Sequence, residues 1–278
     1  MHIDKEIFVC PNCKKELSFD KNLVCTFCNK IYPVIDNKYY FTSVNNTIPD
    51  KFDKIKYYLK QFSGFYNFLI TVVSPVYIPL QLKHFLKKEL VSDNKIAINL
   101  GSGNSSISKK IINADLYDYS NVDLICDISN LPFKNESADL IISIAVLEHV
   151  TIPQQIVEEI YRILKPKGKI YIYIPFIQGY HASPHDYQRY TISGMKFLFK
   201  DFKILETKCG SGPTSGFLWI FQEWLAILLS FGIKPLYRFL HLAIMGVTFP
   251  LKFLDVLLIH HPFAENIASG FTIIAEKE

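Results

Sequence analysis

Cysteine is scarce in this sequence, and several features of secreted and nucleic-acid-binding proteins are missing. The 278 residues contain six cysteines. The first residues, MHIDKEIF, are charged and lack the apolar stretch of a secretory signal peptide. The formal net charge of +4 is too small to argue for binding to nucleic acid, and the chain has no basic stripe. We therefore expect reduced thiols, a cytoplasmic protein and no nucleic-acid partner.

Four of the six cysteines lie near the start of the chain as two Cys-x-x-Cys pairs, Cys10 with Cys13 and Cys25 with Cys28. A disulfide within such a pair would close too small a loop to stabilise the fold much. Two pairs at this spacing instead suit tetrahedral zinc, and four thiolates leave no open ligand position. The sequence therefore predicts a structural zinc ribbon over residues 1–45 that needs Zn²⁺ to fold. A thioredoxin-like redox pair is the weaker alternative, because no βαβ pattern surrounds either pair.

The segment that follows the second pair, CTFCNKIYPVIDNKYYF, resembles the zinc ribbon of tRNA-methyltransferase activators. The resemblance rests on Tyr32, Pro33, Val34 and Asp36, followed by a closing apolar strand at 39–41. It implies a ribbon of a type that often precedes methyltransferases, and it names no substrate.

The rest of the chain divides into a helical extension and an α/β domain. A polar stretch, VNNTIPDKFD, is typical of a linker, and the extension over 46–94 has an amphipathic helical pattern interrupted at Pro75 and Pro79. From residue 95 onward, strand and helix patterns alternate, which predicts an α/β domain with a parallel sheet over 95–278. Its expected strands are KIAINL, VDLIC, ADLIISIAV, KIYIYIP, FKILETKC and GFTIIAEK, and we expect FKILETKC to run parallel to its neighbours.

The stretch INLGSGNSS contains the most informative motif of this domain. A strand leads directly into Gly101-x-Gly103, where the absence of Cβ atoms permits a tight turn and close approach of a ligand. Many nucleotide-binding folds share this feature. Asp115 is expected at the end of the second strand, where it can accept both hydroxyls of a ribose. Asp127 follows the next strand, where it can accept an adenine amino group.

Together with LPF, SADLIISIAVLEHV and EIYRILKPKGKIYIYIPF, these residues resemble class I S-adenosylmethionine-dependent methyltransferases. The resemblance covers 95–209 and is nearest to the small-molecule group that includes quinone and sterol methyltransferases. It implies a Rossmann-like seven-stranded sheet that binds S-adenosylmethionine. It also implies a role for each matching residue: Gly101 and Gly103 line the methionine part, Asp115 binds ribose, and Asp127 with the Ile128 amide binds adenine.

The sequence departs from this family at two points. Asn99 stands where the family usually has an acid, so it can accept a hydrogen bond from the cofactor but adds no charge. The segment between Gly103 and Asp115 is short, which predicts a truncated first helix.

The candidate catalytic residues follow the fourth and fifth strands, since open α/β sheets bind ligands at the carboxyl ends of their strands. They are His149, His185 and Arg189, the last two in the loop PFIQGYHASPHDYQRYT. A histidine can act as a base near neutral pH. In the alternative interpretation, His149 caps a helix and the loop residues only fix the loop. A metal site made by His181, His185 and Asp186 is less favoured, because one loop rarely supplies a complete site.

The same loop resembles a pattern in methyltransferases found with polysaccharide and lipid-glycan genes, which implies a glycan- or lipid-linked acceptor. An apolar segment over 210–262 follows, and charged residues interrupt it before a membrane-spanning length is reached. We expect amphipathic helices at a membrane surface, with Trp219, Trp224 and the cations Lys234, Arg238 and Lys252 at the headgroups. A helical lid, a homodimer face and a spanning helix are the alternatives.

The sequence therefore predicts a methyltransferase, peripheral to the membrane, with a small-molecule acceptor. A non-catalytic scaffold or activator subunit is the alternative, favoured by Asn99 and the short first helix. An RNA methyltransferase is less favoured, because the Asn/Asp-Pro-Pro-Tyr/Phe acceptor motif is missing as well as a basic stripe.

Overall fold

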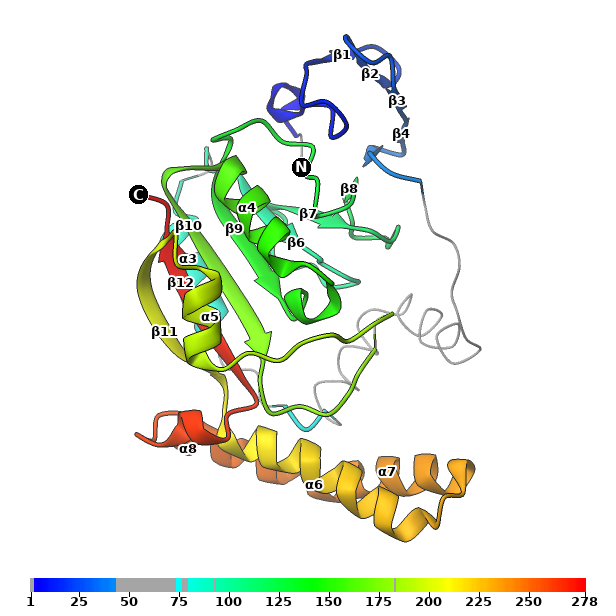
Figure 1. Ribbon diagram of the computed structural model, residues 1–278, viewed down its shortest axis with the longest axis vertical. Helices are drawn as coiled ribbons and strands as arrows, with labels where there is room; N and C mark the ends of the chain where they lie inside the picture. The colour runs from blue at the N-terminus through cyan, green and yellow to red at the C-terminus, as the bar shows by residue number, and fades with distance from the viewer. Residues whose placement is uncertain (1–2, 44–73, 77–79, 93, 183) are drawn as a thin grey trace.

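The computed structural model describes residues 3–43, 74–76, 80–92, 94–182 and 184–278 (Figure 1). The predicted linker and most of the predicted helical extension lie outside these residues. One helix of the extension is described, α3 (Gln81–Glu89).

A nine-stranded sheet forms the centre of the fold, in the order β11-β12-β10-β9-β6-β7-β8-β5-β4. Its strands are β4 (Val34–Ile35), β5 (Lys38–Tyr40), β6 (Ala97–Leu100), β7 (Ile111–Asp115), β8 (Leu124–Ile125), β9 (Ala138–Ile144), β10 (Leu164–Pro175), β11 (Lys203–Ser211) and β12 (Gly270–Glu276). The central strands are parallel, and their continuous apolar runs are buried on both faces. The strands β6 to β12 confirm the predicted Rossmann-like seven-stranded sheet.

The expectation that FKILETKC runs parallel to its neighbours is wrong. This segment is β11, and its partner β12 is antiparallel both to it and to β10. The reason is topological, because the chain leaves β11 and re-enters β12 at the same edge, where Ser211 and Gly270 are register partners. Two antiparallel pairings restore the direction, so β11 still ends at the carboxyl edge of the parallel strands.

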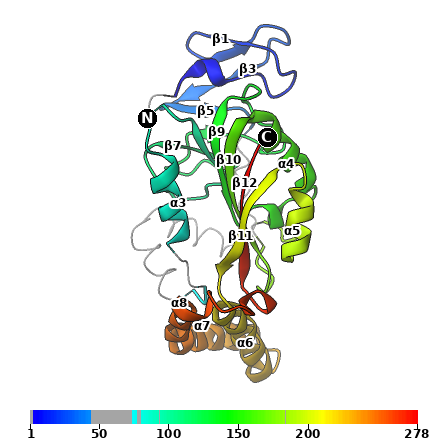
Figure 2. The same ribbon diagram turned by 90° about the vertical axis from the view of Figure 1, so that its left-hand side faces the viewer.

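Helices cover both faces of the sheet (Figure 2). On one face lie α4 (Pro153–Ile163) and α5 (Ile192–Leu198). On the other face Leu86 of α3 packs with Ile111, Ile142 and Tyr171. Residues 101–110, between β6 and β7, contain no helix, so the first helix predicted as truncated is absent. Thus α3 from the N-terminal extension supplies apolar cover on this face.

The cysteine-rich segment has its own three-stranded antiparallel sheet and also joins the large one. The small sheet comprises β1 (Leu17–Phe19), β2 (Leu23–Cys25) and β3 (Ile31–Tyr32), after a short 3-10 helix, η1 (Lys5–Ile7). The next two strands, β4 and β5, extend the large sheet, since β5 pairs in parallel with β8. Phe8 is buried against Tyr39, Phe41 and Phe133. The ribbon and the α/β domain therefore share one sheet and one core.

The apolar segment forms a helical insertion between β11 and β12, which lies at one end of the molecule (Figure 1). It consists of α6 (Pro213–Ser230), α7 (Lys234–Thr248), η3 (Phe249–Leu254), α8 (Asp255–Leu258) and η4 (Ala264–Asn266). The fully buried Asp255 accepts hydrogen bonds from the N–H groups of Thr214 and Ser215, each at 2.8 Å. A carboxylate is favourable at a helix N-terminus, so Asp255 ties α8 to the start of α6.

Candidate active site and thiolate cluster

The glycine motif and the first predicted acid lie together at the carboxyl edge of β6 and β7. Gly101 and Gly103 have φ of +66° and +55°, a backbone region that glycine adopts without strain. Asp115, the last residue of β7, accepts a hydrogen bond from the Gly103 N–H at 2.7 Å and from the Tyr117 N–H at 2.9 Å. This carboxylate therefore holds the glycine loop against β7, a structural role that the sequence did not reveal.

Asn99 is buried and bound within the sheet. Its Nδ2 donates to Oδ1 of Asn113 at 3.1 Å, and Nδ2 of Asn113 donates to the Asn121 carbonyl at 3.1 Å. A neutral amide suits this position, because a buried charge would need a stronger partner. Contact of Asn99 with a cofactor stays a prediction.

A cavity of about 260 Å³ brings the predicted adenine residues beside a predicted catalytic one. Asp127, Ile128, His149, Ile152 and Tyr187 are among the residues that line it. Asp127 is oriented by Ser129, whose N–H and Oγ donate to its Oδ1 at 2.9 and 2.7 Å. The geometry thus brings Asp127, Ile128 and His149 to one site, although nothing in it tests their roles.

Glu148, which was not predicted from the sequence, lies beside two histidines in the structure. A short 3-10 helix, η2 (Leu147–His149), follows β9 and directs Glu148 into the core with no exposed surface. Its Oε1 lies 3.7 Å from Nε2 of His149 and 3.8 Å from Nε2 of His181. An acid beside a histidine directly after a buried strand was the available indication, but sequence alone does not reveal burial.

The loop after β10 is braced by Asp186 and Arg189. Two hydrogen bonds join the guanidinium to the carboxylate, at 2.5 and 2.6 Å, and the His181 N–H donates to the same carboxylate at 2.8 Å. Burial opposes ionisation of Asp186, but the Arg189 guanidinium and the His181 amide hold the pKa of its carboxyl below the usual value. Arg189 also donates to the Gly179 carbonyl at 3.1 Å. These contacts favour a loop-fixing role for Arg189.

His185 contacts His149 through its backbone carbonyl. Its side chain is exposed, whereas its carbonyl accepts a hydrogen bond from Nδ1 of His149 at 2.6 Å. In the neutral imidazole this bond places the proton of His149 on Nδ1, so that Nε2 carries the lone pair. The predicted catalytic roles of His185 and Arg189 stay predictions.

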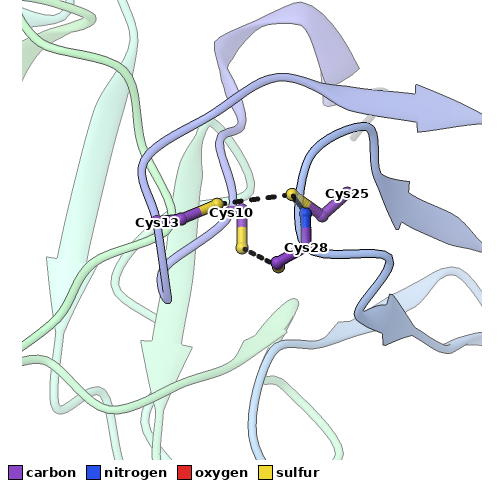
Figure 3. A group of neighbouring side chains, drawn as sticks. All are labelled: Cys10, Cys13, Cys25 and Cys28. Atoms are coloured by element: carbon purple, nitrogen blue, oxygen red, sulfur yellow. Dashed lines mark hydrogen bonds between the residues drawn. The ribbon is translucent and has the colours of Figure 1, made fainter.

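The four early cysteines form a cluster, shown in Figure 3. The Sγ atoms of Cys10 and Cys28 are 3.7 Å apart, those of Cys13 and Cys25 are 3.4 Å apart, and all four lie within 4.8 Å of one another. A disulfide needs a separation of about 2.0 Å, whereas Zn–S bonds of about 2.3 Å in a tetrahedron place sulfurs about 3.8 Å apart. The Tyr32 hydroxyl, 3.0 Å from Sγ of Cys10, adds a hydrogen-bond partner. The donor set therefore fits a tetrahedral metal such as zinc.

The thiols of Cys13 and Cys25 differ in how readily they ionise. Burial disfavours the thiolate of Cys25, but the amides of Cys28 and Phe27 outweigh it and lower the pKa of Cys25 to about 6. The amide of Lys15 favours the Cys13 thiolate, yet burial and the neighbouring thiols raise the pKa of Cys13 to about 12. A bound cation would be needed to hold four thiolates together.

Comparison with known proteins agrees with this geometry. Residues 96–172 match the family model described as "Methyltransferase domain". A human protein described as "Probable tRNA methyltransferase 9B" is 41% identical over 54 residues, which are 18% of this chain and only 12% of that protein.

Two of the distantly similar solved structures contain methyltransferases. One is the complex between the Haloferax volcanii Trm112 methyltransferase activator and a methyltransferase, with 15% identity, a TM-score of 0.47, and coverage of 83% of this chain and 99% of that chain. Another is Haemonchus contortus phosphoethanolamine N-methyltransferase 2 with S-adenosyl-L-methionine, with 17% identity, a TM-score of 0.42, and coverage of 71% and 52%. At these values we draw nothing from them about substrate. The domain match, the strand order and the glycine loop together identify residues 96–172 as the centre of a class I S-adenosylmethionine-dependent methyltransferase domain.

Proposed function

We propose that this protein transfers a methyl group from S-adenosylmethionine to a small molecule that carries an apolar or lipid-linked part. The observation that carries the proposal is the meeting of the glycine loop, Asp115, Asp127 and a cavity bordered by His149 at one edge of the sheet. Bound S-adenosylmethionine supplies an activated methyl group, so the chain's own task is to hold an acceptor in line with it.

The residues of this edge suit the two ends of such a cofactor. The backbone at Gly101 and Gly103 is free of Cβ atoms and suits the methionine part, while the carboxylates of Asp115 and Asp127 suit the ribose and the adenine. Asp127 is exposed at the cavity and Asp115 is almost buried. His149 offers Nε2 to the site, because its Nδ1 is bound to the His185 carbonyl.

The helical insertion supports an apolar acceptor, because it begins beside this site. The ring of Trp219 in α6 lies 5.4 Å from the ring of His181. A Cβ on Gly179 would lie 2.6 Å from Nε1 of Trp219, so glycine permits this close approach. An acceptor that reaches His149 and His181 would thus meet the first turns of α6.

The outer surface of the insertion supports membrane contact. In α7 no residue is buried, although most of its side chains are apolar. Among the described residues, one helical segment, Lys234–Leu258, has the length and mean hydropathy (1.5) of a membrane span, with 11% of its most apolar stretch buried. Large apolar side chains are exposed along both helices: Phe217, Ile220, Trp224, Ile227, Leu228, Phe239, Leu242 and Val247. An apolar surface that extends over two helices is unusual for helices exposed to water and is typical of a contact with a membrane or a protein.

Polar contacts inside the insertion indicate that this exposed arrangement is specific. Nε2 of Gln222 donates to Oγ1 of Thr248 at 2.7 Å, and the Tyr237 hydroxyl donates to Glu223 at 2.5 Å. These bonds join α6 to α7 and leave the apolar side chains on the outside. A peripheral protein on the cytoplasmic membrane face is therefore our proposal, and a homodimer face is the alternative.

Two residues expected at the headgroups are engaged elsewhere. Lys252 is 2% exposed, and its Nζ donates to the Ser74 carbonyl at 2.8 Å. Trp219 contacts His181. The remaining residues, Trp224, Lys234 and Arg238, are exposed and stay in the proposal.

We also propose that the four cysteines hold one structural Zn²⁺. With four thiolates, the ion would have no open position for a substrate. Its role would be to fix the ribbon, and through β5 it would support the sheet that carries the cofactor site.

A scaffold without activity is the second candidate. The side chain of Val146 packs so closely against Gly101, a residue assigned to the cofactor, that a Cβ there would lie 2.4 Å from Val146 Cγ2. Calorimetry of the intact protein with S-adenosylmethionine separates the two candidates. We expect saturable binding with one site per chain, followed by transfer of labelled methyl to a component of a membrane-lipid extract. Absence of cofactor binding would favour the scaffold.

A further inference from the structure

Glu148 poses a problem of buried charge. It has no exposed surface, and among the described residues neither of its carboxylate oxygens has a hydrogen-bond partner. A buried carboxylate without partners is costly, and native structures seldom contain one that serves no purpose. The groups that face it are the two histidine nitrogens, Nε2 of His149 and Nε2 of His181.

The separations suit a shared ion better than hydrogen bonds. At 3.7 and 3.8 Å, both nitrogens are too far from Oε1 to form hydrogen bonds. Ligands about 2.0–2.1 Å from a tetrahedral metal lie about 3.3 Å from one another. The three donor atoms lie within 4.8 Å of one another, so a small inward movement would bring them to that spacing.

The hydrogen bonds of the two rings point to the same conclusion. Nδ1 of His149 donates to the His185 carbonyl at 2.6 Å, and Nδ1 of His181 lies 3.1 Å from the Gly179 carbonyl. Nη2 of Arg189 lies 3.2 Å from Nδ1 of His181, but it has two hydrogens and makes shorter hydrogen bonds to Asp186, at 2.6 Å, and to the Gly179 carbonyl, at 3.1 Å. Both rings can therefore donate through Nδ1 and present an Nε2 lone pair, as metal-binding histidines do.

We propose that Glu148, His149 and His181 bind a divalent first-row metal ion, such as Zn²⁺, Co²⁺ or Mn²⁺. One carboxylate and two imidazoles are a donor set that these ions accept, and the ion's charge compensates the buried carboxylate. The ligands come from two elements, η2 after β9 and the loop after β10, so the site does not depend on one loop. It is separate from the cysteine cluster and differs from it in donor type.

The site has an open side. The side chains of His149 and His181 are 14% and 28% exposed, and His149 lines the cavity that contains Asp127. Three protein ligands leave at least one position for an oxygen from outside, which is the arrangement of a catalytic metal. In this assignment His149 is a ligand and not the general base that the sequence suggested.

The use of the ion in methyl transfer rests on the proposed function. An acceptor hydroxyl bound to the ion would lose its proton to solvent more readily. Its oxygen would then form a bond to the methyl carbon as the sulfur–carbon bond breaks, and the sulfonium would become a neutral thioether. Occupancy of the site is independent of this step and can be tested without activity.

Metal counting on the full chain tests the proposal. Protein stripped with a chelator under reducing conditions is titrated with Co²⁺, because thiolate-bound cobalt gives intense charge-transfer bands and cobalt bound by imidazole and carboxylate does not. We expect two equivalents of Co²⁺ per chain, one bound by thiolates and one bound by imidazole and carboxylate. Glu148→Gln and His181→Ala should weaken the second equivalent by more than about 100-fold, since they remove ligands and not outer-shell partners. His185→Ala keeps the carbonyl and should retain both.

A single equivalent with thiolate bands only would overturn the proposal, as would a second equivalent that persists in Glu148→Gln. Because the wild-type count decides by itself, misfolding of a variant does not obscure the result. Calorimetry with S-adenosylmethionine on the same samples distinguishes a failure of the metal-site proposal from a failure of the proposed function. Cofactor binding without a second metal removes only this inference, and a second metal without cofactor binding removes only the proposed function.

Discussion

Tyr39 of the ribbon is the register partner of Leu124 in β8, so a strand of the cysteine-rich segment is hydrogen-bonded into the methyltransferase sheet. Phe8, whose ring contacts that of Tyr39, is also buried against Phe133 of the α/β domain. Unfolding of the ribbon would therefore remove a hydrogen-bonded neighbour of β8 and so disturb the loop that carries Asp127.

Loss of the metal from the ribbon should therefore destabilise the whole protein. We expect Cys25→Ser to lose the thiolate-bound metal and to lower the thermal midpoint of the main unfolding transition by at least about 5 °C. Metal analysis and calorimetric unfolding measure the two effects. Cys209→Ser, outside the cluster, is the control and should keep the metal. An unchanged midpoint in Cys25→Ser would show that the ribbon unfolds separately.

The junction between ribbon and domain should weaken in acid. Asp118 accepts hydrogen bonds from Lys38 at 2.5 Å and from Tyr40 at 2.8 Å, and these outweigh burial and lower the pKa of Asp118. A carboxyl with a lowered folded pKa stabilises above its unfolded pKa of about 3.9, and this contribution is lost as the pH falls through the folded value.

Comparison of wild type with Asp118→Asn as a function of pH checks this. We expect the variant to be less stable by on the order of 1 kcal/mol at neutral pH, a modest value because the pair is partly exposed. The difference should shrink below about pH 4, as the wild-type carboxyl becomes protonated. A difference that grows in acid would contradict the sign of the shift.

Asp115→Ala should weaken binding of S-adenosylmethionine by on the order of 2–4 kcal/mol, because charge-assisted hydrogen bonds exceed neutral ones. Part of this loss would come from the glycine loop, which Asp115 holds through the Gly103 N–H. Calorimetry gives the affinity, and hydrogen exchange over 101–106 reports the loop. Unchanged affinity would mean that Asp115 does not face the cofactor.

Arg189→Ala and His185→Ala should differ in effect. Removal of Arg189 leaves Asp186 without its guanidinium and loosens the loop that carries His181, so we expect methyl transfer to fall by on the order of tenfold or more. His185→Ala retains the carbonyl that binds His149 and should cost less. Cofactor affinity should change little in both variants. If both lose the cofactor, the loop belongs to the cofactor pocket.

Liposome flotation tests the outer surface of the insertion. The intact protein should float with anionic vesicles, and Trp224→Glu with Leu228→Glu should abolish flotation, because both side chains are exposed in α6. Phe197→Glu, a single apolar-to-acidic change at an exposed position of α5, is the control and should still float. A soluble dimer that does not float would assign this surface to a subunit interface.

The sequence predicted the sheet well, because strands buried on both faces are continuous apolar runs. Gly101 follows the first of them directly, and Asp115 ends the second. The sequence did not predict that β4 and β5 join this sheet. Strands of two and three residues have no measurable periodicity, and their pairing with β8 is a long-range contact. The antiparallel direction of β12 was not predicted for a similar reason. The direction of this strand depends on the edge of the sheet at which the chain returns from the insertion, and composition does not reveal that edge.

The candidate site was predicted in part. Glycines and acids at strand ends indicate a cofactor edge directly, as the Gly103 to Asp115 hydrogen bond illustrates. Glu148 was missed because its significance is its burial against two histidines, and only the fold brings His181 to it. Likewise, Lys252 is a headgroup candidate by sequence, but in the fold its ammonium binds a backbone carbonyl.

The base of the helical insertion is closed. Ser211 and Gly270 are paired across β11 and β12, and the Ser269 N–H donates to the Gly212 carbonyl at 3.1 Å, so the chain leaves and rejoins the sheet at a single point. A short link from Gly212 to Ser269 would preserve the strand pairings. Changes in the length or composition of the intervening helices need not disturb the edge that holds Gly101 and Asp115. Under the proposed function, the helices that would contact the acceptor and the membrane could therefore be altered without displacement of Gly101 or Asp115.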